Sequence, residues 1–102
     1  PEDGLIYYFL PQCYVFGAKN CNGFAKDATF WVAYDMLQKA IPLLEGDYPE
    51  FAANAKSLAA TYRSAFPTTE ECFFNELSEG STYTVNCGFV SGVPTKVRYR
   101  AQ

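Results

Sequence analysis

The stretch DATFWVAYDMLQKAIP, from Asp27 to Pro42, constrains the fold of this chain more than any other segment. Its apolar residues recur at the i, i+3, i+4, i+7 spacing of a helix that starts at Asp27, a good N-cap residue, and stalls at Pro42. Bulky side chains such as Trp31 and Met36 widen the apolar surface of this helix. The polar strip that remains consists of Asp35, Gln38 and Lys39. A helix this apolar must be covered on more than one side, so we expect it to be the central element.

Two further helices are expected, one before and one after the central helix. The first runs from about Asp3 to Gly17, and Pro11 within it either kinks or restarts the helix. Residues 18–27 then form a loop. The third helix is capped by Asp47, carries Pro49 in its first turn, and ends at Pro67. Its apolar stripe consists of Phe51, Ala55, Leu58, Ala59, Tyr62, Ala65 and Phe66.

The last third of the chain changes character. Thr68 followed three residues later by Glu71 is a capping-box pattern, which predicts a short fourth helix. Period-two alternation then predicts two strands joined by a turn at the segment SGV. One face of the first strand carries Tyr83, Val85, Cys87 and Phe89, and one face of the second carries Thr95, Val97 and Tyr99. We therefore expect a mainly α, α+β domain over 1–102, with antiparallel helices (1–66), a short helix (67–78) and an antiparallel β-hairpin (79–102).

The composition argues against catalysis. Among 102 residues there is no histidine, the commonest general base and a common metal ligand. The cysteines therefore lack a partner for nucleophilic catalysis, and adjacent acids such as Glu70 and Glu71 suit the first turn of a helix. A hydrolase would need a cleft with converging titratable groups near Glu70 to Glu79. We expect no catalytic residue, no metal and no cofactor.

A cluster of positive charge lies near the C-terminus. Lys96, Arg98 and Arg100 hold three of the eight positive charges, at alternate positions of the second predicted strand. They are a candidate contact for an anion, but a solvated outer face is the favoured interpretation, because three charges are a small footprint. The rest of the chain is acidic, so we expect no nucleic acid as a partner.

The four cysteines allow three full pairings, and the sequence alone does not choose among them. We favour a bridge from Cys21 in the predicted loop to Cys87 in the predicted strand. Cys13 is either part of a bridge or a free thiol buried in the core, because a free cysteine also packs as a small hydrophobe. An even number of cysteines in a small domain indicates an oxidising compartment.

The first predicted helix is uncharged and rich in aromatic residues. Tyr7, Tyr8, Phe9, Tyr14 and Phe16 form a candidate interaction surface. This segment is too short to span a bilayer, so we expect no membrane insertion. The surface would pack against a preceding repeat, or else against an unknown protein partner, and it predicts self-association of this chain.

The spacing in the first two helices resembles the tetratricopeptide repeat. Cys13 takes the small position and Phe16 the aromatic position of the first helix of that repeat. The second-helix pattern is matched by Ala33, Leu37 and Ala40. This chain departs from the pattern in its longer turn, in Pro11, and in Glu45 where the consensus has proline.

A longer pattern resembles the C-terminal region of tetratricopeptide-repeat proteins of Bacteroidota. It comprises CNGFAKDATFWVAYDMLQKA, AANAKSLAATYRSAFPTTEECFFNELSEGSTYTV and TKVRYR, from Cys21 to Arg100. The resemblance implies a non-enzymatic scaffold protein that is located in the bacterial periplasm or envelope or is secreted. It also implies that this chain is the last repeat plus the cap of a longer array. The start at Pro1 fits that expectation. The alternative is a small disulfide-bonded secreted binding or inhibitor protein of the immunity type.

Overall fold

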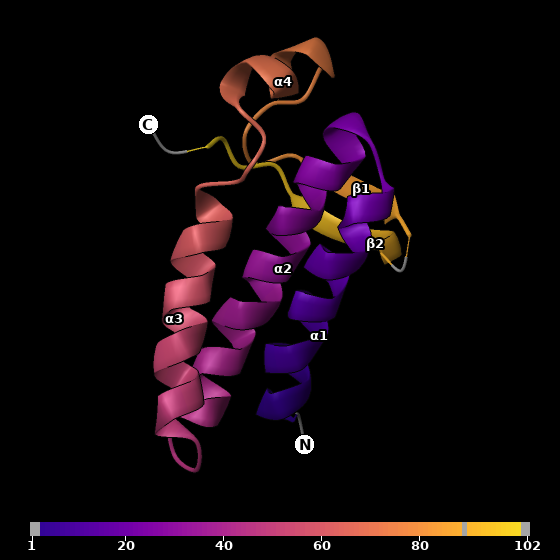
Figure 1. Ribbon diagram of the computed structural model, residues 1–102. Helices are drawn as coiled ribbons and strands as arrows, with labels where there is room; N and C mark the ends of the chain where they lie inside the picture. The colour runs from indigo at the N-terminus through magenta and orange to yellow at the C-terminus, as the bar shows by residue number, and fades with distance from the viewer. Residues whose placement is uncertain (1–2, 89, 101–102) are drawn as a thin grey trace.

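The computed structural model of this chain describes residues 3–88 and 90–100. Three long helices are followed by a short helix and a two-stranded antiparallel hairpin, which confirms the mainly α, α+β prediction (Figure 1). The elements are α1 (Gly4–Gly17), η1 (Ala18–Asn20, a 3-10 turn), α2 (Gly23–Leu44), α3 (Pro49–Arg63), α4 (Thr69–Phe74), β1 (Thr82–Cys87) and β2 (Val90–Lys96).

Helix α2 is the central element, as predicted. Helices α1 and α3 run antiparallel to it and pack along it, and the hairpin packs on its N-terminal half (Figure 1). Trp31, Leu37 and Leu44 are fully buried. The buried residues form one cluster beneath the hairpin, which includes Trp31, and a second cluster among the three long helices, which includes Leu37.

Helix α2 is longer at both ends than the sequence predicted. It begins at Gly23, so Asn22 and not Asp27 occupies the N-cap position, and it continues through Pro42 to Leu44. Pro42 lies in the last turn, where its missing N–H costs the helix a single bond. Burial of Leu44 against the neighbouring helices favours the extra turn. The predicted loop before α2 shrinks to η1 and two further residues, Cys21 and Asn22.

Helix α1 passes through Pro11 without a break. Pro11 is buried, and the side-chain amide of Gln12 donates to the carbonyl oxygen of Tyr8, one turn back, at 3.0 Å. Close packing begins at the N-terminus of the helix, where Gly4 faces Leu43. A Cβ on Gly4 would lie 2.9 Å from the Cβ of Leu43, so a side chain there would push α1 away from α2.

Helix α3 differs from its prediction at both ends and in its stripe. Tyr48 and not Asp47 precedes its first residue, and the helix ends at Arg63 rather than Pro67. The chain leaves the helix there because Phe66 turns inward and is buried beneath the hairpin. The buried stripe consists of Ala52, Ala55, Ala59 and Tyr62. Phe51, which was expected in that stripe, is 36 % exposed.

The predicted capping box starts α4. The backbone N–H of Glu71 donates to the Thr68 hydroxyl, and the backbone N–H of Thr68 donates to the Glu71 carboxylate, both at 3.1 Å. The helix ends after Phe74, so it has fewer than two turns. Phe73 and Phe74 are 77 % and 82 % exposed.

The hairpin turns at a different place from the predicted one. Cys87 pairs with Val90, so the chain reverses between these two residues, and the segment SGV lies inside β2. Gly92 is an extra residue there, because Val85 pairs with Val93 and Asn86 with Ser91. Its positive φ of 76° suits glycine, and its N–H donates to the Asn86 side chain at 3.0 Å.

The inward face of the hairpin confirms the predicted alternation for the residues that are described. Val85, Cys87, Thr95 and Val97 are buried, and Tyr83 and Tyr99 are half-buried. Phe89, which was expected on the same face, lies outside the described residues. The hairpin thus covers Trp31 and its neighbours on α2.

The Cys21–Cys87 disulfide favoured from the sequence is present, and it joins the start of α2 to the end of β1 across 66 residues. The other two cysteines are free. Cys72 is buried, whereas Cys13 is exposed and is not the core thiol that one interpretation expected. Cys13 is exposed because the side of α1 that carries it faces away from α2.

We predict that the double substitution Cys21→Ala/Cys87→Ala lowers the free energy of unfolding. A bridge that closes a loop of this length restricts the unfolded chain, so the loss should be about 2–4 kcal/mol. Urea unfolding followed by tryptophan fluorescence measures it. Cys13→Ala is the matched control and should change stability by less than about 0.5 kcal/mol. An unchanged midpoint in the double variant would contradict the prediction.

Candidate interaction surface on the first helix

The alternation had predicted that the three basic residues near the C-terminus share one solvated face. In the structure they do not. Strand β2 ends at Lys96, and the chain then bends towards α3, which turns the two arginines inward. Only Lys96 among the three is exposed, and its ammonium group donates to the Thr82 hydroxyl at 3.0 Å.

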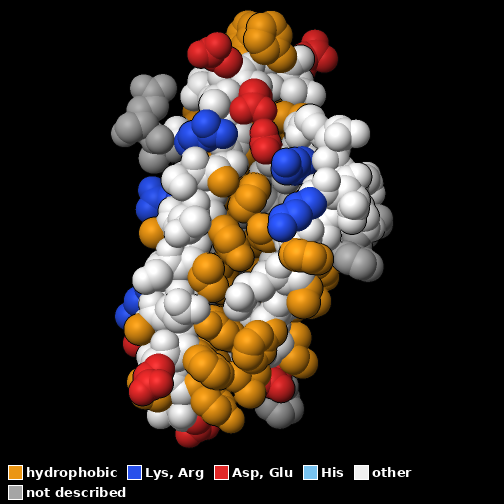
Figure 2. Space-filling view, viewed as in Figure 1, with side chains coloured by type: hydrophobic (Ala, Val, Ile, Leu, Met, Phe, Trp, Pro, Cys, Tyr) orange, Lys and Arg blue, Asp and Glu red, His pale blue; other side chains and the backbone are white. Residues whose placement is uncertain are grey.

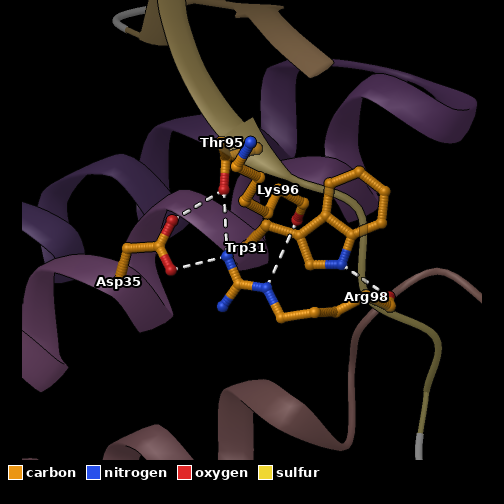
Figure 3. A network of polar contacts seen from close by, with 5 residues as sticks. All are labelled: Trp31, Asp35, Thr95, Lys96 and Arg98. Carbon is orange, nitrogen blue, oxygen red and sulfur yellow. Dashed lines mark hydrogen bonds and ion pairs between the residues drawn. The ribbon is translucent and has the colours of Figure 1, made fainter. Parts of the chain in front are cut away.

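Arg98 anchors the hairpin to α2 (Figure 3). Its guanidinium lies 2.6 Å from a carboxylate oxygen of Asp35, and the other oxygen of that carboxylate accepts from the Thr95 hydroxyl at 2.7 Å. The indole N–H of Trp31 donates to the carbonyl oxygen of Arg98 at 2.8 Å. One arginine thus joins two residues of α2 to the end of the hairpin.

Arg100 ties the end of the chain to the segment that follows α3. Its side-chain Nε donates to the carbonyl oxygen of Phe66 at 2.6 Å, and its backbone N–H donates to that of Pro67 at 3.0 Å. All three cations of the candidate anion contact are therefore bonded within the chain, and the two arginines are also half-buried.

The acidic residues near α4 mainly serve local structure. Glu71 belongs to the capping box, and a carboxylate oxygen of Glu79 accepts from the backbone N–H of Tyr99 at 3.3 Å. The Tyr99 hydroxyl in turn accepts from the backbone N–H of Glu79. Glu70 and Glu76 are exposed.

Asp27 and Glu71 form a carboxyl pair that the sequence had not indicated, because Asp27 was expected as a helix cap. Burial raises the pKa of Asp27, and so do a hydrogen bond to Glu71 and the charge of that neighbour. The pKa of Glu71 is lowered, chiefly by the backbone N–H of Thr68. Of the two carboxyl groups, Asp27 therefore has the higher pKa, and the positive charge of Arg100 opposes the rise.

The five aromatic residues proposed as an interaction surface differ in exposure: one is buried, two are half-buried and two are exposed. Tyr8 is buried, with its ring stacked on Phe51 of α3 at 5.1 Å. Tyr7 and Tyr14 are half-buried beside Val93 and Pro94 of the hairpin. The two remaining residues are exposed, Phe9 by 51 % and Phe16 by 70 %.

The exposed side of α1 forms a narrow apolar stripe, which we call the α1 seam. It consists of Ile6, Phe9, Cys13 and Phe16, the four residues of α1 that are exposed. Their spacing of three, four and three residues is that of the a and d positions in a coiled coil. Ile6 and Cys13 were missing from the predicted surface because that surface was defined by aromatic residues and not by this spacing, which starts at Ile6.

The α1 seam adjoins a wider apolar area. Hydrophobic side chains run in a stripe between α3 and α1, and the stripe widens towards the end of the molecule that holds the N-terminus and the α2–α3 turn (Figure 2). Phe9 contacts Phe51 edge to face at 5.9 Å, and Tyr48 stacks on Phe51 at 5.8 Å. These three partly exposed rings extend the seam onto α3.

Two other kinds of site were sought within residues 3–88 and 90–100. No group of three or more His, Cys, Asp or Glu side chains there could hold a metal ion. In the same residues, no helix is both long and apolar enough to cross a membrane.

The chain was also compared with known proteins. It matches no protein-family model, no curated protein and no solved structure. The resemblance to tetratricopeptide-repeat proteins stays a prediction that rests on the quoted residues.

We predict that Asp35→Ala loosens the hairpin. The substitution removes the acceptor for Arg98 and Thr95, and because both partners of the ion pair are partly exposed, the loss should be about 1–2 kcal/mol. Urea unfolding measures stability, and near-ultraviolet circular dichroism reports on Trp31. Gln38→Ala, on the same exposed strip, should stay within about 0.5 kcal/mol. Equal effects of the two substitutions would contradict the anchoring role.

We predict a pH-dependent gain in stability from Asp27→Asn. Because the pKa of Asp27 is raised by folding, its protonated form stabilises the native state at low pH, and this contribution is lost as pH rises through the raised pKa. An asparagine amide donates to Glu71 at every pH. The free energy of unfolding of the variant should therefore rise relative to that of the wild type, by about 1 kcal/mol, as pH rises from the ordinary carboxyl range through the raised pKa of Asp27.

The matched control for this measurement is Asp47→Asn, at an exposed position in the α2–α3 turn. The difference in free energy of unfolding between Asp47→Asn and the wild type should not change over the same pH range. A stability difference for Asp27→Asn that shrinks as pH rises would show that the carboxyl pair is not the cause.

Proposed function

We propose that this chain is a non-enzymatic protein-interaction or scaffold module whose docking surface is the α1 seam. The observation that carries the proposal is that all four exposed residues of α1 are uncharged, and three are large and apolar. A helix that faces water normally carries polar residues on its outer side. A contiguous apolar stripe marks a contact surface instead.

The spacing of the α1 seam fits a helix as the contacting element. Residues at a and d spacing pack into the holes between the side chains of a facing helix. Helix α1 has 14 residues, so it is about 21 Å long and would accept about four turns of a partner helix. Helix-on-helix contact is also how repeat units stack, and the hairpin on α2 fits a terminal cap. Both features support a terminal tetratricopeptide-like unit.

The Cys21–Cys87 disulfide supports an oxidising location. Together with the resemblance to proteins of Bacteroidota, the bridge supports our proposal that the protein lies in the bacterial periplasm or cell envelope, or is secreted. The same bridge also favours the second candidate function, a small secreted inhibitor of the immunity type. Two bridges and a monomeric state would favour that candidate, whereas Cys13 and Cys72 are both free.

Photo-crosslinking from Cys13 tests the proposal. Cys13 is the exposed free thiol, and Cys72 is buried, so a benzophenone maleimide labels the centre of the α1 seam. The labelled protein is illuminated in an envelope extract of the source organism, and adducts are identified by mass spectrometry. We expect one or a few discrete adducts, which Phe16→Glu reduces at least about tenfold because it places a charge in the contact.

The matched control carries the label on another exposed apolar site. The double variant Cys13→Ser/Phe74→Cys presents the photo-group on α4 and should not form the same adducts. A seam that yields no discrete adduct, or the same adducts as the α4 label, would refute the assignment of the docking surface.

A further inference from the structure

We propose that the partner of the α1 seam is a second copy of this chain, with the two α1 helices antiparallel about a two-fold axis. The inference rests on the proposed function, because it names the occupant of the same surface. Three features carry it: the side-chain sizes along the seam, the charges at the two ends of α1, and the area that the seam exposes.

The side chains of the α1 seam complement one another when two copies lie antiparallel. If the axis passes midway between Phe9 and Cys13, Ile6 faces Phe16 of the second copy, and Phe9 faces Cys13 of the second copy. Each layer then combines a larger and a smaller side chain, which fills the interface evenly. A parallel pair would instead place Phe against Phe in two layers and leave a thin layer at Cys13.

The charges at the ends of α1 favour the same arrangement. Helix α1 itself carries no charged residue, but Asp3 caps its start, and Lys19 follows its end with its ammonium group 4.6 Å from the Phe16 ring centre. The antiparallel register places Asp3 near Lys19 of the second copy at both ends of the interface. A parallel pair would bring like charges together and would align the helix dipoles unfavourably.

The exposed area predicts a weak and reversible dimer. Ile6, Phe9 and Phe16 are 51–70 % exposed, and side chains of this size would together contribute about 350 Å² per copy. A standard stable interface buries about 800 Å² per partner, so this contact belongs to the small class even with Tyr48 and Phe51 at its edge. The dimer should therefore dissociate in the micromolar range.

Sedimentation velocity of the purified chain at about 1 to 300 µM is the first test. We expect a monomer–dimer equilibrium that Phe16→Glu weakens at least about tenfold, because a charge would face Ile6 of the second copy. Phe16 is suited to the test because its side chain is 70 % exposed, so a substitution there removes little packing within the chain. Phe74→Glu is the matched control, since Phe74 is 82 % exposed on α4, and it should leave the equilibrium unchanged.

A charge exchange tests the antiparallel register. Asp3→Lys and Lys19→Glu each place like charges at both ends of the interface, so each should weaken the dimer by about three- to tenfold. Mixing the two variants restores two attractive pairs and should restore the dimer. Because Asp3→Lys also removes a helix cap, circular dichroism must show that α1 remains helical. A separate mixture of Lys19→Glu with wild type should recover only part of the affinity.

The outcomes separate this inference from the proposed function. A wild-type chain that stays monomeric at the highest concentration, or a dimer that survives Phe16→Glu, overturns the second copy as the occupant. Discrete adducts to a different protein in the crosslinking experiment would then still support the α1 seam as a docking surface. A dimer that Phe16→Glu abolishes but that mixing does not restore overturns the antiparallel register.

Discussion

The enclosure of α2 is the constraint on which the rest of this structure depends. Its apolar surface extends so far around the helix that one neighbour cannot cover it, and the chain supplies three different covers. Helices α1 and α3 lie along it, and the hairpin covers Trp31. The position of the Cys21–Cys87 bridge and of the Asp35–Arg98 ion pair follows from this arrangement, because both attach the hairpin to α2. The outer side of α1 stays exposed in this arrangement.

Periodicity predicted the kinds of element but not where they end. The helical spacing around α2 and the alternation after Glu79 were sufficient for the fold class. Helix ends depend on tertiary burial, so α2 continues through Pro42 to bury Leu44, and Asp27 became an interior residue. The hairpin turn was misplaced because Gly92 resembles a turn residue, whereas its amide is held by Asn86 inside a bulge. That contact joins residues of different strands and leaves no local signal.

The candidate site was harder to predict for a related reason. The side chains of α1 contain almost no polar contrast, so the sequence could not show which side of the helix is buried. Tyr8 was proposed as exposed but packs against Phe51, while Cys13 was considered for the core and is exposed. Arg98 was assigned to an outward face because the strand was assumed to continue. Its long side chain instead reaches back to Asp35, a partner 63 positions earlier in the sequence.

The separation of contacts along the chain sets the order in which this protein can be completed. The three long helices contact their neighbours in sequence, so they can assemble while the chain is still emerging from a ribosome or an export channel. The hydrogen bond from the Trp31 indole to the carbonyl oxygen of Arg98 can form only after that residue, 67 positions later, has been made. The same holds for the disulfide between Cys21 and Cys87. A chain cut after α3 would lack the hairpin residues that cover Trp31 and the thiol that pairs with Cys21. The hairpin is thus the last part of this domain to gain its packing, because two of the contacts that hold it join residues 66 and 67 positions apart.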